Sequence, residues 1–474
     1  MTIAHIRQRR WPLAAGLISI ATLSGCASFS PDGGFAAVEQ ATQARLGKQV
    51  LWSRSAADQA RIGERVADLL ARPLTVDDAV QVALLNNRGL QAGFQALAIT
   101  EAEVVQAGRL PNPGFSFGRL RRGDEVELER GLHFNLARLL ALPWSGPLEA
   151  RRLEQVQGQA ALRVLALAAD TRKAYFNALA AEQTVRYQRQ VQQAAEASAT
   201  LARRMAQVGN FNALQRAREQ VFQAEALLNL ARAEQAQRAA RERLIRLLGA
   251  WGEQTGFTLP ERLPDLPASA HELPDVESLA LAQRLDVQGA KQAAAQTAAS
   301  LGLTRSTRFI NVLEIGALSK TSNEAPPQRG WAISVELPLF DWGGARVARA
   351  EAVYLQALHQ AAETAINARS EVREAYTAYR SAYDIARYQR DEVLPLAQRI
   401  ADENLLRYNG MLIGVFELLA DARTQIASVN AAILALRDFW VAQADLDMAM
   451  IGPAGMTPAG AGPAMAAESR SAGH

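Results

Sequence analysis

The chain has 474 residues, of which 49% are hydrophobic and 21% are charged, with 51 Lys and Arg against 48 Asp and Glu. Its one cysteine, Cys26, excludes a disulfide within the chain and a cysteine-based metal site. Removal of residues 1–25 takes away three arginines and no acid, so the remaining chain is formally neutral and lacks the basic footprint of a nucleic-acid-binding protein.

Residues 1–25 have the layout of a secretory signal. Three arginines precede the apolar run from Trp11 to Ala21, which is shorter than the roughly 20 residues that a membrane-spanning helix needs. The next residues, Leu23-Ser24-Gly25-Cys26, resemble the lipobox of bacterial lipoproteins, which implies that Cys26 becomes a lipidated (palmitate-bearing) N-terminus. No Asp follows Cys26, which in the lipoprotein sorting rule implies the outer membrane. The alternatives are an ordinary signal peptide with a chance cysteine and a buried thiol; residues 27–31 favour a tether.

Three segments recur in the same order at a spacing of about 200 residues, which predicts an internal duplication. The pairs are 86–93 with 282–290, 131–154 with 330–351, and 203–219 with 404–423. The predicted organisation is a signal peptide 1–25, a tether and periplasmic segment 26–71, a first repeat 72–250, a Pro-rich connector 251–271, a second repeat 272–450 and a disordered tail 451–474.

Each half is predicted to contain a helix of about 30 residues, a strand pair and a long helical hairpin. Thr75, before two aspartates, is the expected start of the first helix. The first hairpin is expected over 147–249 with a break at Gly209-Asn210. The second is expected over 344–450 with a break at Asn409-Gly410 and a kink at Pro395. A first arm of about 60 residues would reach on the order of 90 Å, which indicates a rod.

The expected strands alternate in hydrophobicity over the length that a tilted membrane strand needs. The clearest is 331–340; the next is 132–142, where Arg138 falls on the apolar side, and the partner strands are expected over 112–120 and 308–318. Two soluble hairpins packed on helices are the alternative. If the strands cross a membrane, four of them cannot close a barrel, so several chains must share one, and three chains give twelve strands.

These motifs together resemble the TolC-like outer-membrane efflux proteins over residues 72–450. The most specific are ELPLFDWGGARVARAEA (336–352), similar to the family's strand-to-helix turn, and LRYNGMLIGVFELLADART (406–424), similar to its helical tip. The lipobox resembles the lipoprotein branch, and residues 208–219 resemble its heavy-metal, CzcC- and CusC-like members. The resemblance implies a mainly α fold with a β-barrel contribution: a homotrimer forming a twelve-stranded outer-membrane barrel that continues into a periplasmic helical tunnel.

The resemblance also implies site residues. Adaptor-binding tips are expected at Gly209, Asn210, Phe211, Asn212, Asn409, Gly410, Met411 and Gly414. Strand-to-helix turns are expected at Pro143, Gly146, Pro338, Gly343 and Gly344. An acidic periplasmic constriction is expected at Glu417 and Asp421, although this chain has one more residue between Gly410 and the acid than the family pattern. A solvated helix charge is the alternative for Glu417.

The implied function is a passive exit duct of a tripartite efflux system. Its partners would be a periplasmic adaptor, an inner-membrane pump of the RND type and the outer-membrane lipid. The five histidines do not have metal-ligand spacing, and no nucleophile stands with a base, so neither a metal, a cofactor nor catalysis is expected. The alternatives are a periplasmic adaptor lipoprotein, which usually has one hairpin and β-rich domains, and a structural coiled-coil lipoprotein.

Overall fold

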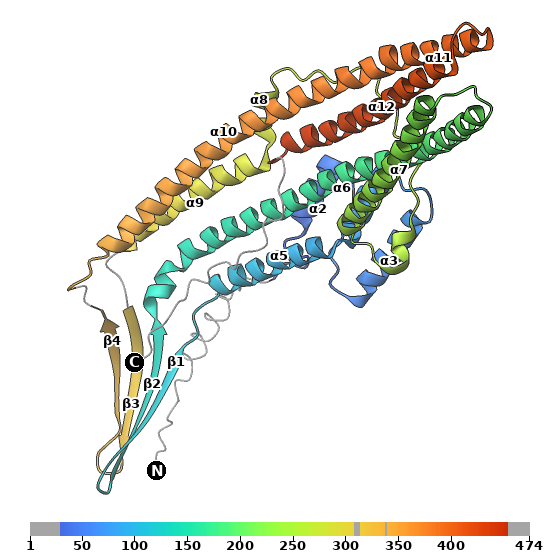
Figure 1. Ribbon diagram of the computed structural model, residues 1–474. Helices are drawn as coiled ribbons and strands as arrows, with labels where there is room; N and C mark the ends of the chain where they lie inside the picture. The colour runs from blue at the N-terminus through green and yellow to red at the C-terminus, as the bar shows by residue number, and fades with distance from the viewer. Residues whose placement is uncertain (1–28, 308–312, 337–338, 454–474) are drawn as a thin grey trace, which may run out of the picture. The chain divides into compact units, whose positions relative to one another are not determined.

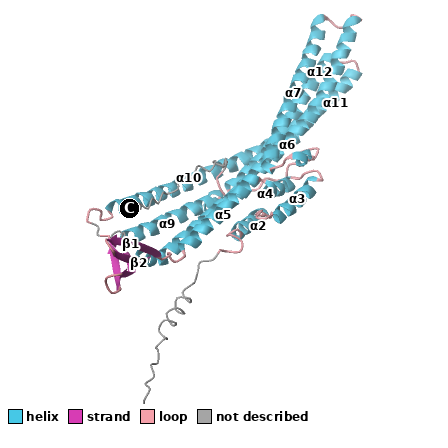
Figure 2. Cartoon of the chain, turned by 90° about the horizontal axis from the view of Figure 1, so that it is seen from below, coloured by secondary structure: helices cyan, strands magenta, loops and turns pink. Residues whose placement is uncertain are grey.

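The computed structural model describes residues 29–307, 313–336 and 339–453. The predictions for the signal peptide, for Cys26, for Pro338 and for the tail from 454 onward therefore lie outside the described residues. Figure 1 shows the course of the chain, and Figure 2 shows that helices dominate and that the strands form a single group.

The same order of elements occurs twice along the chain. Two short helices come first: α2 (Ala36–Leu46) and α3 (Ala56–Leu70). The first half then contains α4 (Val76–Asn86), α5 (Arg88–Ala107), β1 (Gly114–Arg122), β2 (Glu125–Asn135), α6 (Leu136–Gln207) and α7 (Ala213–Leu248). After the 3₁₀ helix η1 (Gly252–Gly256), the second half contains α8 (Val276–Gln283), α9 (Leu285–Thr307), β3 (Leu313–Ser322), β4 (Gln328–Val335), α10 (Gly344–Tyr388), the π-helix η2 (Gln389–Val393), α11 (Leu394–Asn409) and α12 (Val415–Ala449).

The described chain divides into two compact units, and each unit draws on both halves. The strand unit consists of residues 29–34, 95–157 and 292–358, without the undescribed residues 308–312 and 337–338. The helical unit holds residues 35–94, 158–291 and 359–453. The units differ from the repeats because the strands of both halves pair with one another, which the duplication alone does not reveal.

The first half begins where Thr75 caps α4, as expected: its hydroxyl accepts a hydrogen bond from the backbone N–H of Asp78 at 3.1 Å. The prediction of one helix of about 30 residues is wrong, because the chain breaks at Asn87. The residues at this break cap the end of α7. Asn86 Nδ2 donates to the carbonyls of Leu248 and Gly249, and Asn87 Nδ2 donates to that of Leu247 at 3.0 Å. These bonds satisfy carbonyls at the end of α7 that no helix bond can reach.

The second half uses its own break in the same way. Arg284 separates α8 from α9, is 1% exposed, and donates from Nη1 to the carbonyl of Ala449, the last residue of α12, at 3.1 Å. Its charge is matched by Asp286 at 2.7 Å and Glu371 at 2.8 Å. In each half, therefore, the short helix break caps the end of the half's final long helix, although the capping chemistry differs.

The Pro-rich connector is part of the helical unit's core. Phe257, Leu259 and Leu263 are buried with residues of α4, α6 and α7. Farther along, the carbonyl of Pro264 accepts a hydrogen bond from Trp440 Nε1 at 3.0 Å, and that of Ala268 accepts one from the Tyr383 hydroxyl at 2.8 Å. Burying each large apolar side chain stabilises the fold by about 1.5–3 kcal/mol, so the connector is held along its length.

Pro395 lies within the first arm of the second helical hairpin. The chain remains helical there, passing from α10 through the π-helical segment η2 into α11, with Pro395 in the first turn of α11. A proline has no N–H to donate, and one turn with wider hydrogen-bond spacing removes the clash with the preceding carbonyl. A π-helical turn therefore precedes Pro395, and the kink expected there stays a prediction.

Tyr175 makes the stability of the helical unit sensitive to alkaline pH. It is 2% exposed and donates from its hydroxyl to the Leu74 carbonyl at 2.9 Å. Burial, with the nearby charge of Asp78, raises the pKa of Tyr175 to about 12 from 10.0. The folded state therefore holds its proton more tightly than the unfolded state. The contribution of this proton to the free energy of unfolding is complete below pH 10. It is lost as the pH rises toward 12, and the total loss is about 3 kcal/mol.

The expected result for Tyr175→Phe is a smaller loss of unfolding free energy between pH 10 and 12, together with a loss of about 1 kcal/mol at pH 8 from the missing hydrogen bond. Denaturant unfolding at several pH values measures both. Tyr388→Phe is the control, because Tyr388 is 63% exposed and its replacement should leave the alkaline slope unchanged. An unchanged slope in Tyr175→Phe would contradict the assignment.

Candidate functional site

The four strands form one antiparallel sheet in the order β1-β2-β3-β4. The two halves join at β2 and β3, whose register runs from Glu127 opposite Ser322 to Asn135 opposite Glu314. The strands have 8 to 11 residues, close to the length of a tilted membrane-spanning strand. The strands from both halves are therefore hydrogen-bonded into one sheet, and they lie side by side in Figure 1.

One face of this sheet, called here the apolar face, is hydrophobic and exposed. Register and alternation put its side chains on the same side. Val126, Leu128 and Leu313 on this face are half-buried. Its exposed large apolar members, with exposed fractions from 37% to 74%, are Phe115, Phe117, Leu132, Phe134, Ile315, Trp331, Ile333 and Val335. An exposed apolar patch made of so many neighbouring side chains is typical of a surface that contacts lipid or another protein.

The opposite face, called here the acidic face, carries the sheet's glutamates. Glu125, Glu127, Glu129 and Glu314 all lie on it. Lys320 lies between two of them, paired with Glu127 at 3.2 Å and with Glu129. Leu120 and Leu318 also lie on this face. The two faces thus differ strongly in polarity, as in a sheet that separates lipid from water.

The turns between sheet and helix differ between the halves. Pro143 and Gly146 were expected in a turn, but both lie inside α6, because β2 ends at Asn135 and α6 begins at Leu136. The leucines after Asn135 fit a helical period as well as a strand period, so the pattern did not fix the boundary. In the second half, Gly343 and Gly344 lie at the predicted place: Gly343 has φ of 74° and Gly344 begins α10. Asp341 fixes the turn by accepting from the Gly343 N–H at 2.8 Å.

The first predicted tip joins α6 to α7. Gly209 has φ of 82°, a conformation that favours glycine. Asn212 caps α7, and its side chain and that of Gln215 each accept a backbone hydrogen bond at 2.8 Å from the other residue. Phe211 is buried, while Asn210 is exposed. Hydrogen bonds therefore define this tip on its α7 side.

The second predicted tip joins α11 to α12 and is less constrained. Asn409 ends α11, Gly410 donates from its N–H to the Leu406 carbonyl at 2.9 Å, and Gly414 precedes α12 without a side-chain cap. Met411 has φ of 56° and is 93% exposed. A non-glycine residue in this left-handed region costs of order 1 kcal/mol, so the exposed methionine is held in an unfavourable conformation.

Glu417 and Asp421 lie one helical turn apart in α12. Glu417 is exposed and lies in the first turn, where the helix dipole stabilises a carboxylate by roughly 0.3–1 kcal/mol. This position agrees equally with a solvated helix charge and with a constriction residue, so the constriction role of both residues stays a prediction.

Sequence reasoning missed a buried charge cluster that links three long helices. Glu219 in α7 is 1% exposed. It accepts from the Ser198 hydroxyl of α6 at 2.8 Å and pairs with Arg423 of α12 at 2.9 Å. The Arg423 guanidinium also lies 4.3 Å from the centre of the Phe222 ring. Nothing in the sequence distinguishes these residues from the many other charges on the long helices.

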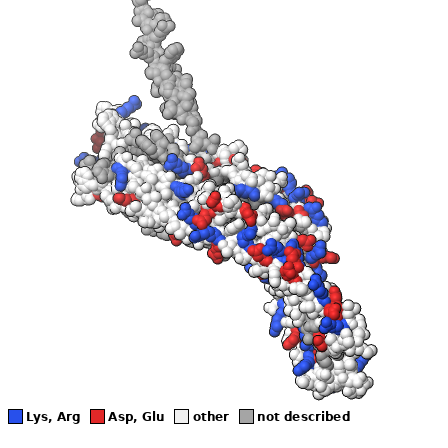
Figure 3. Space-filling model, turned by 90° about the horizontal axis from the view of Figure 1, so that it is seen from above, with Lys and Arg blue, Asp and Glu red and all other residues white. Residues whose placement is uncertain are grey.

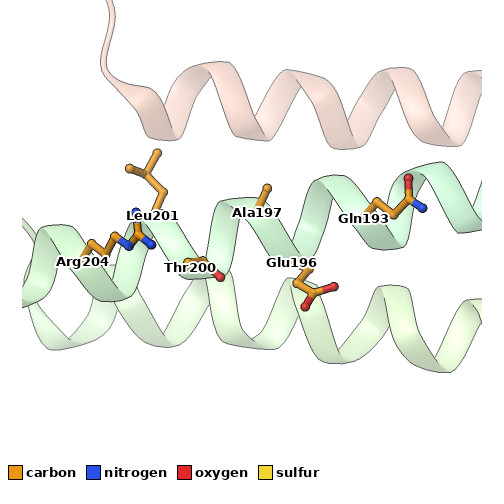
Figure 4. Close-up of a pocket in the computed structure, with 6 residues that line it drawn as sticks. All are labelled: Gln193, Glu196, Ala197, Thr200, Leu201 and Arg204. Atoms are coloured by element: carbon orange, nitrogen blue, oxygen red, sulfur yellow. The ribbon is translucent and has the colours of Figure 1, made fainter.

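The helical unit also has a shallow groove along α6. Its cavity measures about 450 Å³ and is lined by Gln193, Glu196, Ala197, Thr200, Leu201 and Arg204. Figure 4 shows these side chains along one stretch of α6. Spacings of three and four residues put them on one helical face.

Among the residues that the structure describes, no group of three or more His, Cys, Asp or Glu side chains has a metal-binding arrangement. None of the described helices combines the length and the apolar character needed to cross a membrane. On the face seen in Figure 3, positive and negative side chains are interspersed and do not gather into a patch of one sign.

The fold is similar to that of solved outer-membrane channels. The chain matches the Campylobacter jejuni CmeC outer membrane channel with a TM-score of 0.68 and 17% identity, covering 79% of this chain and 85% of that one. It matches a CusC structure described for transmembrane channel formation with a TM-score of 0.66 and 18% identity, covering 80% and 92%. It matches the outer membrane protein VceC of Vibrio cholerae with a TM-score of 0.66 and 14% identity, covering 79% of this chain and 95% of that one. No protein-family model and no curated protein matches the sequence.

Proposed function

We propose that the chain is the outer-membrane channel of an efflux system, a passive exit duct without catalytic activity. The observation that carries this proposal is the two-faced sheet: an exposed apolar face on one side and four glutamates on the other. Such a sheet suits a wall between lipid and an aqueous lumen. The fold shared with outer-membrane channels supports the same function.

The duct is a homotrimer in this proposal. Within the described residues, β1 pairs with β2 and β4 pairs with β3, so the outer edges of β1 and β4 have no partner in one chain. Unpaired backbone groups in lipid cost several kcal/mol each. Pairing β4 of one copy with β1 of the next removes these edges, and three copies then close a twelve-stranded barrel. The long helical hairpins supply the periplasmic tunnel.

The partners follow from the same assignment. The hairpin tips at Gly209–Asn212 and Asn409–Gly414 contact a periplasmic adaptor, which connects the duct to an inner-membrane pump of the RND type. Cys26 carries the lipid that attaches the N-terminus to the membrane. An adaptor would itself be β-rich with one hairpin, whereas the described residues form four strands in one sheet and two long hairpins.

Membrane fractionation and conductance test the proposal. The expected result is a heat-sensitive trimer in detergent extracts of the outer membrane, with steady conductance in planar bilayers. Recovery only from the inner membrane, or monomers that do not conduct, would overturn it.

Glu417→Ala is expected to lower cation selectivity. Three copies of Glu417 around one opening would attract cations. In water, one carboxylate attracts a monovalent cation about 4 Å away by about 1 kcal/mol, which corresponds to about a fivefold change in relative permeability. Reversal potentials under a salt gradient measure the ratio. Glu225→Ala removes an exposed carboxylate from α7 and serves as the control. Equal selectivity in the wild type and Glu417→Ala would remove Glu417 from the constriction.

A further inference from the structure

The apolar face of the sheet ends in a group of arginines. Phe117, the last large apolar residue of β1 on this face, lies opposite Arg130. In the same row, Ser319 lies opposite both Arg130 and Arg329. Arg119 and Arg121 follow on β1 at the next two positions of this face. We call these four residues the arginine cluster: Arg119, Arg121, Arg130 and Arg329.

Charge in this sheet is sorted by face. The strand residues on the apolar face include the four arginines and no acid, whereas all four glutamates of the strands lie on the acidic face. Arg130 and Arg329 are separated by one intervening strand, which places their backbones about 10 Å apart, and Arg119 is a diagonal neighbour of Arg130. Like charges this close raise the free energy of the sheet unless an anion lies among them.

Within residues 29–307, 313–336 and 339–453, no acidic side chain is paired with these arginines. All four arginines are exposed, and among the described residues none of them forms an ion pair. Arg121 Nε donates to the carbonyl of Gly123 at 3.0 Å, a neutral acceptor. Asp124 and Glu324 lie in the two hairpin turns nearby, yet no ion pair joins them to the cluster. The guanidinium groups are therefore free to bind an external anion.

The position of the cluster along the strands identifies the anion. The helices α5 and α6 join the strands at Gly114 and Asn135, so the hairpin turns lie at the opposite end. From Leu313 of β3 to the row of Ser319, where Arg130 and Arg329 begin the cluster, the apolar face is about 20 Å long, comparable with the apolar band of about 25 Å on membrane barrels. Beyond that row, Leu128 and Val126 of β2 lie beside Arg119 and Arg121, so the cluster is at the level of lipid head groups. Arginine there costs little and binds phosphate through two parallel hydrogen bonds.

We propose that the arginine cluster binds the phosphate groups of a phosphorylated glycolipid in the outer leaflet, and this inference rests on the membrane placement proposed above. The lipid supplies several phosphates on one head group, which matches neighbouring arginines about 7–10 Å apart in a cluster about 20 Å wide. Binding fixes the depth of the barrel in the membrane and stabilises the assembled trimer.

The test compares two lipids that differ only in phosphate. Purified trimers are placed in phosphatidylcholine vesicles that contain either bis-phosphorylated lipid A or dephosphorylated lipid A with the same acyl chains. The lipid A retained per trimer is measured by native mass spectrometry, and the temperature at which trimers dissociate is measured on gels. We expect about tenfold greater retention of the phosphorylated form and a higher dissociation temperature. Inorganic phosphate alone is expected to change neither quantity, which separates a lipid site from a phosphate site.

Variants then locate the site. Arg130→Gln with Arg329→Gln is expected to remove most of the difference between the two lipids. Arg122→Gln should keep it, because Arg122 is at the same end of the sheet but on the acidic face. Equal retention of the two lipids by the wild type would overturn the inference without any variant. Loss of the difference in Arg122→Gln as well would also overturn the assignment to this face. Trimers that conduct in phosphatidylcholine alone but ignore lipid phosphate refute only this inference, whereas the absence of conducting trimers refutes the proposed function.

Discussion

Replacing Ile333 with lysine is expected to abolish recovery of the protein as a membrane-inserted trimer. Ile333 is 52% exposed in the middle of the apolar face, opposite Ile315. If that face contacts lipid, a lysine near the bilayer centre costs roughly 2–4 kcal/mol in each chain, and the cost is counted three times in a trimer. The total is comparable with the whole stability of many folded proteins.

Ser334→Lys is the matched control, one residue farther along β4. Ser334 lies on the acidic face opposite Glu314, where a lysine meets an opposite charge. Heat-sensitive trimers in outer-membrane extracts measure the outcome for both variants. If Ile333→Lys assembles as well as Ser334→Lys does, the apolar face is not the lipid-facing one.

Glu219→Ala is expected to destabilise the helical unit by about 1–3 kcal/mol, because the Arg423 side chain that it leaves unpaired is 37% exposed and still reaches water. Arg423→Met should cost more, about 3–5 kcal/mol, because it leaves Glu219, whose side chain is 2% exposed, as an unpaired buried charge. The double variant Glu219→Leu, Arg423→Met is expected to recover much of the loss, since no charge then remains to be buried. Denaturant unfolding of the three variants measures the coupling between the two residues.

An exposed ion pair between α6 and α7, the two long helices of the first hairpin, gives the control. Arg189 of α6 and Glu234 of α7 lie 3.0 Å apart, but both side chains are at least one third exposed. Glu234→Ala should therefore cost less than 1 kcal/mol, as surface pairs generally do. Additive losses in the double variant of Glu219 and Arg423 would show that the two residues stabilise the helices independently.

The sequence predicted the helical hairpins well, because long runs rich in Ala, Leu, Gln and Glu have no competing structure. Gly209 and Asn409 mark the hairpin tips to within a few residues. Thr75 was identified as a cap because its hydroxyl acts on a backbone N–H three residues away. Helix caps and helix-ending glycines act on residues three or four positions away, so they can be predicted from the sequence alone.

The boundaries that the sequence misplaced depend on distant contacts. The helix break at Asn87 occurs because Asn86 and Asn87 cap α7, which lies about 160 residues farther along. The start of α6 at Leu136 could not be separated from a longer strand, because leucines at these spacings satisfy both patterns. The partner of Glu219 is likewise more than 200 residues away, at Arg423.

By itself, the sequence determined the duplicated order of helix, strand pair and long hairpin, and the alternation that gives each strand an apolar side. Only the tertiary structure decided that the strands of the two halves join into one sheet with a fixed register. That register sets the arginines at the end of the apolar face and all the glutamates opposite. The physical reason is that alternation within a strand assigns each side chain to one of two faces, whereas pairing between strands decides which residues of different strands share a face.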